Sequence, residues 1–174
     1  MSFLETLATL TKWEDGEPSS ERTAALLWAL ARFHRPLVVV EAGTYHGHVA
    51  LTLADALRSA NVPGHVWTAD VNESPVLTHA AALGLTDAIT FFWGDFLAML
   101  PTVPTPIDFA YLDAGPDHDG LRWRHFEALQ PLLAPGALVA TDDVAGSWPQ
   151  VERFRAHTLY LPNHRGLALW QKPY

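Results

Sequence analysis

The feature that most constrains this chain is the alternation of short apolar segments with segments of helical periodicity. Strand-forming residues fill 37–41, 65–70, 89–93, 107–112 and 137–141. Apolar residues at helical spacing occupy the stretches between them, after a first helix that ends near His34. This order predicts an α/β fold with a parallel sheet covered by helices on both faces. Two later segments, 158–161 and 167–170, flank a turn and predict a terminal antiparallel hairpin.

Composition favours a single acidic domain built on this sheet. The chain has 174 residues, 49% of them hydrophobic, and a formal net charge of −8. This length predicts one domain over 1–174, with 1–18 as an N-terminal extension. The negative charge argues against a nucleic-acid partner and against an anionic membrane surface. Because no apolar run has the length of a membrane span and no cysteine is present, we expect a cytoplasmic protein.

Acidic residues mark the end of every predicted parallel strand. They are Glu41, Asp70, Asp95, Asp113, Asp142 and Asp143. The carboxyl ends of parallel strands share one edge of an open α/β sheet, and ligands bind outside that edge. We therefore expect these acids to line a common site, although loop acids that serve solubility alone would explain some of them.

The loop after the first predicted strand contains Glu41, Gly43, Tyr45 and Gly47. Glycine admits tight turns and lets a ligand approach the backbone, and the helix that follows offers free N–H groups. The dinucleotide pattern G-x-G-x-x-G fails because Tyr45 stands at its second glycine. An acid so close to Gly43 suits a ligand with an amino group and a sulfonium better than a pyrophosphate. A plain strand-to-helix turn is the alternative interpretation.

Two further acids have positions that suit a nucleoside. Asp70 ends the second predicted strand, where a carboxylate can accept hydrogen bonds from both ribose hydroxyls. Asp95 could accept from an adenine amino group. Alternatively, Asp70 could be an acid at the start of the next helix, and Asp95 could cap the helical turn that follows it.

The last three acids form a different set. Carboxylates of Asp113, Asp142 and Asp143 would make a hard, all-oxygen site, which favours Mg²⁺, Ca²⁺ or Mn²⁺ over Zn²⁺. Without a cation, clustered carboxylates raise one another's pKa. The alternative is that Asp142 or Asp143 only caps the segment that follows.

These motifs occur in the order of a known family. The matching segments are 39–50, 68–72, 82–95, 108–113, 133–144 and 165–172. Over roughly 20–172 the chain resembles class I S-adenosylmethionine-dependent methyltransferases, and Tyr45 between the glycines resembles the catechol O-methyltransferase-like branch. The Asp142-Asp143 pair is nearer to a related bacterial group that modifies sugars and antibiotics. The resemblance implies a Rossmann-like three-layer fold, with a mostly parallel seven-stranded sheet and a C-terminal antiparallel hairpin.

The resemblance also implies roles for the acidic edge. The residues implied to bind S-adenosyl-L-methionine are Glu41, Gly43, Tyr45, Gly47, Asp70 and Asp95. Those implied to hold a divalent cation, usually Mg²⁺, are Asp113, Asp142 and Asp143. Such a cation lowers the pKa of a small-molecule hydroxyl, and the oxyanion then accepts the sulfonium methyl in line.

The chain departs from the family pattern just after Asp113. Pro116 stands where the branch has a Lys or His, and His118 follows two positions later. Either His118 or Asp117 could act as the base that removes the substrate proton. His118 could equally be an ordinary loop histidine.

Three functional hypotheses follow. The first is O-methylation of a small molecule, the second a cofactor-binding protein of the same fold without transfer activity, and the third a nicotinamide-dependent oxidoreductase. The missing G-x-G-x-x-G pattern argues against the third. The apolar N-terminal piece and the seven tryptophans suggest a homodimer.

Overall fold

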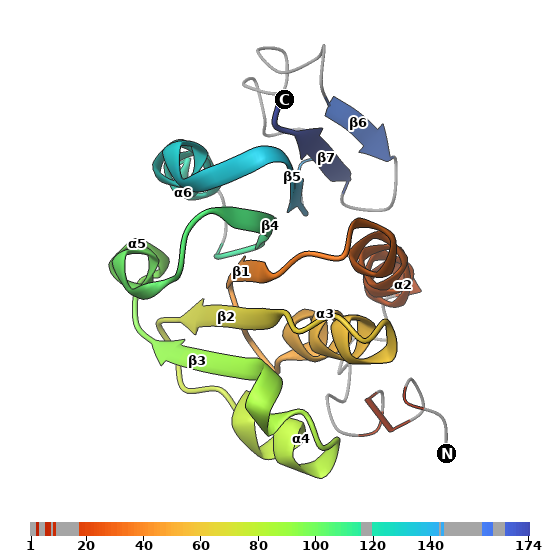
Figure 1. Cartoon of the computed structure of the whole chain (residues 1–174). Coiled ribbons are helices and arrows are strands. Elements are labelled where there is room, and N and C mark those ends of the chain that lie inside the picture. The colour runs from red at the N-terminus through yellow and green to blue at the C-terminus, as the bar shows by residue number, and fades with distance from the viewer. Residues whose placement is uncertain are drawn as a thin grey trace.

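The computed structural model describes residues 3, 6, 7 and 9 and the ranges 18–115, 120–142, 144, 158–161 and 166–174. A seven-stranded sheet forms the centre of this part of the chain (Figure 1), in the order β3-β2-β1-β4-β5-β7-β6. The strands are β1 (Val38–Ala42), β2 (His65–Asp70), β3 (Ile89–Trp93), β4 (Ile107–Leu112), β5 (Leu133–Thr141), β6 (Thr158–Leu161) and β7 (Leu167–Gln171). The helices are α2 (Pro18–His34), α3 (His48–Ser59), α4 (Val76–Ala82), α5 (Phe96–Met99) and α6 (Leu121–Leu129), with 3-10 turns η1 (Thr86–Ala88), η2 (Leu100–Thr102) and η4 (Gln130–Leu132).

The strand directions confirm the predicted sheet. β1 to β5 pair in parallel, so their carboxyl ends meet at one edge. β7 runs antiparallel to both β5 and β6, as the hairpin prediction required. The register aligns Glu41 with Thr68 on one side and with Tyr111 on the other. These three side chains therefore lie on one face of the sheet, because directly paired residues of neighbouring strands point the same way.

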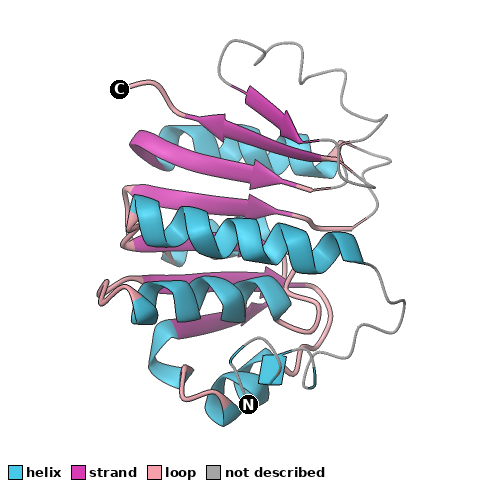
Figure 2. Cartoon of the chain, turned by 90° about the vertical axis from the view of Figure 1, so that its right-hand side faces the viewer, coloured by secondary structure: helices cyan, strands magenta, loops and turns pink. Residues whose placement is uncertain are grey.

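Helices cover both faces of the sheet and bury its apolar side chains. One layer contains α2, α3 and α4, which pack Leu27, Leu51 and Leu57 against the sheet. The other contains α5 and α6, which place Phe126 and Leu129 against the opposite face. Figure 2 shows α2 and α3 lying across the near face of the strands. Among the described residues, no helix has the length and apolar character needed to cross a membrane.

One local prediction was wrong. The sequence predicts a helix over 121–133 and a turn at 135–136, but α6 ends at Leu129 and β5 runs straight through that turn. Gly136 has a φ of 79°, and its N–H donates to the Lys172 carbonyl at 3.0 Å. The register with β4 shifts at this point, as it does at a β-bulge. A proline and glycine that favour a turn can therefore be accommodated inside a strand when a neighbouring strand pairs with it.

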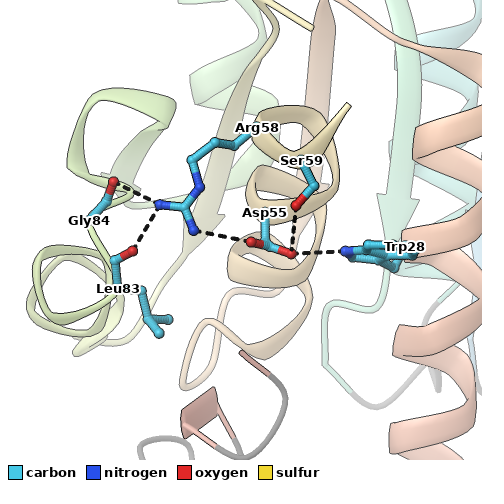
Figure 3. Close-up of polar contacts among 6 residues, drawn as sticks. All are labelled: Trp28, Asp55, Arg58, Ser59, Leu83 and Gly84. Atoms are coloured by element: carbon cyan, nitrogen blue, oxygen red, sulfur yellow. Dashed lines mark hydrogen bonds and ion pairs between the residues drawn. The ribbon is translucent and has the colours of Figure 1, made fainter. Parts of the chain in front are cut away.

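A buried carboxylate joins the helical layer on the α3 face (Figure 3). Asp55 is 6% exposed and accepts hydrogen bonds from Trp28 Nε1 at 2.9 Å and from Arg58 Nη2 at 3.1 Å. Ser59 Oγ donates to the same carboxylate at 3.4 Å. The other amino group of Arg58 reaches the carbonyls of Leu83 and Gly84, just after α4. This Asp55 cluster thus connects α2, α3 and the α4–β3 turn.

Candidate functional site

The candidate site lies at the carboxyl edge of the parallel strands. The sheet order places β1 and β4 side by side although β2 and β3 lie between them in the sequence, so the direction of strand succession reverses there. Ligands of open α/β sheets bind at such a switch point. Glu41 and Asp113 come from the two strands that form it.

A tight turn from Gly43 to Gly47 joins β1 to α3 and forms the floor of this edge. The φ angles of Gly43 and Gly47 are 94° and 85°, a left-handed region that favours glycine. A β-carbon at Gly43 would lie 2.5 Å from the Asp113 carbonyl oxygen, and one at Gly47 would lie 2.4 Å from Val76 Cγ2. Internal contacts with β4 and α4 therefore already require both glycines, before any ligand is considered.

Asp70 holds the middle of the turn in place. Tyr45 has a φ of 46°, and its N–H donates to Asp70 Oδ2 at 2.8 Å. Its carbonyl accepts from Ser74 Oγ at 2.5 Å. The other Asp70 oxygen accepts from the Asn72 backbone N–H at 2.9 Å. Asp70 therefore shapes the glycine turn from the end of β2, and this is a structural task in addition to the predicted ribose contact.

Glu41 lies beneath the turn, inside β1 and not beyond its end. It is 1% exposed, and Thr68 donates a short hydrogen bond to its carboxyl group. Burial raises the pKa of Glu41 to about 8, against the opposing effect of the Thr68 hydrogen bond. Burial therefore favours the neutral form of this carboxyl group in the fold. A cation placed above it would favour the charged form.

Asp95 has the capping role that the sequence left open. Its side chain accepts from the Leu97 backbone N–H at 2.7 Å and caps α5. Asp95 is exposed at the same sheet edge, after Gly94. Capping occupies Oδ1, and the predicted adenine contact stays a prediction.

Asp113 and Asp142 form an acid pair at the ends of β4 and β5. The hydroxyl of Tyr111 lies 3.3 Å from Asp113 Oδ2 and 3.2 Å from Asp142 Oδ2. Burial raises the pKa of Tyr111 well above its ordinary value, and the two neighbouring carboxylates raise it further. Tyr111 therefore stays protonated, and its single hydrogen is shared between two acceptors. The two acids thus contact one hydroxyl group, and their role as metal ligands stays a prediction.

Arg122 contributes a positive charge in contact with Asp113, one member of this pair. Its Nη2 donates to Asp113 Oδ1 at 3.2 Å and to the Gly115 carbonyl at 2.9 Å. The Arg122 side chain is 3% exposed, while that of Asp113 is 34% exposed. Sequence reasoning missed both Arg122 and Tyr111. The available signal was an arginine in the first turn of a helix, where the helix dipole disfavours a positive charge.

Three predicted site residues lie outside the described residues, namely Asp143, Asp117 and His118. The part of the chain that the structure describes contains no group of three or more acids and histidines arranged to hold a metal ion. The third proposed metal ligand and the proposed base therefore stay predictions.

Exposed apolar side chains surround the glycine turn. Tyr45, Val71 and Trp93 are 65%, 67% and 65% exposed, and each follows or ends a strand at this edge. Trp93 Nε1 donates to the Val71 carbonyl at 3.2 Å, which holds its indole beside the end of β2. The site thus combines one buried carboxyl group, that of Glu41, with accessible acids and aromatic side chains, and small-molecule sites commonly combine apolar surface with a few polar groups.

Comparison with known proteins identifies a family that matches the part of the chain that forms this edge. The family model described as a methyltransferase domain matches residues 40–144, which is more than half of the chain. The match begins within β1 and runs past Asp142, so it contains the glycine turn and the acid pair. No curated protein sequence matches.

Solved structures show the same fold. An O-methyltransferase from Streptomyces achromogenes, TomG, solved with SAM, is 23% identical, with a TM-score of 0.74 over 98% of this chain and 90% of that chain. An O-methyltransferase from Bacillus cereus in complex with SAH is 18% identical, with a TM-score of 0.72 over 97% and 87% of the two chains. The SAH-bound Podospora anserina methyltransferase PaMTH1 is 17% identical, with a TM-score of 0.71 over 98% and 88%.

Proposed function

This chain belongs to the methyltransferase domain family, and on that premise we propose that it transfers a methyl group from S-adenosylmethionine to a hydroxyl of a small molecule. The observation that carries the proposal is the convergence of Glu41, Asp70 and Asp113 around the glycine turn at the switch point of the sheet. Structures of the same fold bound to SAM or SAH support the choice of methyl donor.

The cofactor half of the proposed site consists of the glycine turn and the acids beside it. Glu41 would face the cationic end of the cofactor, because an ammonium or sulfonium offsets the cost of ionising a buried carboxyl. Asp70 would accept from the ribose hydroxyls while it holds the Tyr45 backbone. Gly43 and Gly47 would let the backbone approach the cofactor, and Asp95 would lie at its adenine end.

The acceptor half of the proposed site lies at the acid pair. Two carboxylates that share the Tyr111 hydroxyl supply hard oxygen ligands and fit a divalent cation such as Mg²⁺ in their chemistry. Asp143 would complete the set. When bound, the cation would lower the pKa of a substrate hydroxyl. The chain itself would align that hydroxyl with the methyl donor, and most of the acceleration would come from this alignment.

The proton from the substrate hydroxyl requires an acceptor. We propose His118, with Asp117 as the alternative, because both follow Asp113 closely in the sequence and carry groups that can accept a proton. Substitution of each by Ala, with methyl transfer measured as a function of pH, distinguishes them. The variant that removes the base loses the rate increase on the acidic side of the profile.

We also propose that the working unit is a homodimer. Phe33 and Leu37 are 89% and 54% exposed near the opposite edge of the sheet, where α2 leads into β1. Contiguous exposed apolar patches are typical of contact surfaces, and these two side chains would form part of such a patch. Light scattering at micromolar concentration should give twice the chain mass, and a monomer mass contradicts the proposal.

Calorimetric titration with S-adenosylhomocysteine tests the proposed function most directly, because it needs no substrate. We expect saturable binding by the wild type and a loss of about tenfold in affinity for Asp70→Ala, which removes charged hydrogen bonds. Asp87→Ala is the matched control, since Asp87 is an exposed acid away from the turn. Absence of binding by the wild type overturns the proposal.

Methyl transfer to a panel of catechols and sugar hydroxyls, with and without EDTA, tests the chemistry. We expect transfer that EDTA abolishes. Transfer that survives chelation removes the metal from the proposal. Cofactor binding without transfer to any acceptor favours a binding protein of the same fold, and binding of NADH in place of S-adenosylhomocysteine favours an oxidoreductase.

A further inference from the structure

The acid pair is in contact with a buried arginine, which a site that only binds a metal cation does not need. Arg122 contributes a permanent positive charge in contact with Asp113. The guanidinium is nearly buried, so it is not a mobile surface charge that happens to lie near an acid. A buried arginine has lost most of its hydration, and its contact with a carboxylate offsets that cost.

The position of Arg122 in its helix makes the contact more informative. It is the second residue of α6, two positions after the N-cap Gly120. The helix dipole disfavours a cation there, and the local preference would be an acid. A residue that contradicts a local rule while it is buried against a site residue indicates a role in that site.

We propose that Arg122 is the resident counter-cation of the acid pair, and that it lowers the affinity of this pair for a divalent cation. The inference rests on the proposed metal site. Arg122 Nη2 occupies Asp113 Oδ1, an oxygen that a bound cation would use, and its charge repels a cation at the same carboxylates. The pair is thereby kept assembled in the absence of metal, and the metal has to compete with the arginine.

The mechanism assigns distinct tasks to the two groups around the pair. Tyr111 supplies one hydrogen to two carboxylates, which brings them together without changing their charge. Arg122 supplies the positive charge and, through Gly115, holds the start of the loop after β4. Arg122 is therefore a positioning residue, because its effect on the acceptor would act through Asp113.

Binding of Mn²⁺ measured by EPR of the free ion tests the proposal without any turnover. We expect Arg122→Gln, which removes the charge but keeps hydrogen-bond donors, to bind Mn²⁺ about tenfold more tightly than wild type. Arg122→Lys keeps the charge and should stay near the wild-type affinity. Arg124→Met is the matched control, because Arg124 is exposed on the same helix and should leave Mn²⁺ binding unchanged.

Equal or weaker Mn²⁺ binding by Arg122→Gln overturns the inference, since the arginine would then organise the site and not compete with the metal. If Mn²⁺ binds neither protein while S-adenosylhomocysteine still binds both, the inference fails and the methyl-transfer proposal stands. If S-adenosylhomocysteine does not bind either, the proposed function itself fails.

Loss of a buried arginine could also unfold the chain, and a second measurement covers that case. Arg122→Met tests the same change of charge with an apolar side chain that is also long and unbranched. If either neutral variant loses its cooperative thermal transition, the melt is repeated with Mn²⁺. We expect Mn²⁺ to restore the transition by replacing the missing charge, and failure to restore it overturns the inference.

Discussion

Two groups of carboxylates among the described residues each contact an arginine, and they differ in their exposure and in the parts of the fold that they connect. The Asp55 cluster gives one carboxylate three donors from Trp28, Arg58 and Ser59. The acid pair gives two carboxylates one shared hydroxyl from Tyr111 and one amino group from Arg122. The first group connects helices, and the second lies at the ends of strands at the candidate site.

The difference teaches how a structural acid can be distinguished from a functional one. Asp55 is 6% exposed, and its hydrogen bonds all connect parts of the fold. The side chain of Asp113 is 34% exposed at the carboxyl edge of the sheet, where an additional cationic partner can reach it. Loss of Asp55 should therefore affect stability, and loss of a member of the acid pair should affect chemistry.

The largest expected effect is on the acid pair. Asp142→Asn removes a charge from the proposed metal site and should lower methyl transfer about 100-fold, with a matching loss of Mn²⁺ binding. The free energy of unfolding without metal should change by less than about 1 kcal/mol, because the substitution also removes repulsion between two like charges. Transfer assays and urea denaturation of the same sample measure both quantities.

Glu127→Ala is the control for Asp142→Asn, since Glu127 is an exposed acid on α6. It should change neither transfer nor unfolding. If Asp142→Asn instead destabilises the chain as strongly as a change at Asp55, the distinction between the two groups of acids is wrong.

The next largest effect is expected at the Asp55 cluster, where a substitution should lower stability and leave cofactor affinity nearly unchanged. Asp55→Ala leaves the Trp28 indole N–H and the Arg58 guanidinium without their shared acceptor, and should cost about 3 kcal/mol of unfolding free energy. Affinity for S-adenosylhomocysteine should stay within about twofold of wild type, because the cluster lies on the helical layer and not at the carboxyl edge of the sheet. A clear loss of cofactor affinity would show that the cluster also shapes the site.

The sequence was sufficient to predict most of the sheet but not the partners of its acids. Strand positions follow from local apolar runs, and the acids at their ends could be assigned to one edge from parallel topology alone. Tyr111 and Arg122 reach the acid pair from β4 and from α6, and such contacts depend on how the helix docks against the sheet. The path of β5 through Gly136 depends likewise on its pairing with β7.

The position of Glu41 shows the same limit within a single strand. Its place before Gly43 predicts a site residue, but not that it lies fully buried within β1 beside Thr68. Periodicity indicates which residues can share a face, whereas the depth of a side chain depends on the layer above it. The unusual pKa of Glu41 is a consequence of that depth.

A smaller expected effect is the dependence of the free energy of unfolding on pH that the buried Glu41 carboxyl group causes. Its pKa rises from 4.5 in the unfolded reference to about 8 in the fold, so the folded state retains a proton that the unfolded state loses between these values. The resulting stabilisation is complete below about pH 4.5 and is lost as pH rises to about 8. Glu41→Gln has no ionisable group at this position, so its stability should not fall as the pH rises. It should be more stable than wild type by about 2 kcal/mol at pH 9 and similarly stable at pH 5.

Urea denaturation of both proteins across pH 5 to 9 measures this difference. Parallel pH dependence in wild type and Glu41→Gln would show that the carboxyl ionises normally. Glu41→Asp is the matched variant, because it keeps the ionisable group on a shorter side chain and should retain a fall in stability with rising pH.

The smallest expected effect concerns the shared hydroxyl of the acid pair. Tyr111→Phe removes the one hydrogen that two carboxylates share, and should lower the free energy of unfolding by about 1 kcal/mol in metal-free buffer. With saturating Mn²⁺ the loss should disappear, since a bound cation would then neutralise the carboxylates in place of the hydroxyl. An equal loss in both buffers would mean that Tyr111 contributes only a structural hydrogen bond, as Trp28 does at the Asp55 cluster, and that the acid pair is a structural feature of the sheet edge.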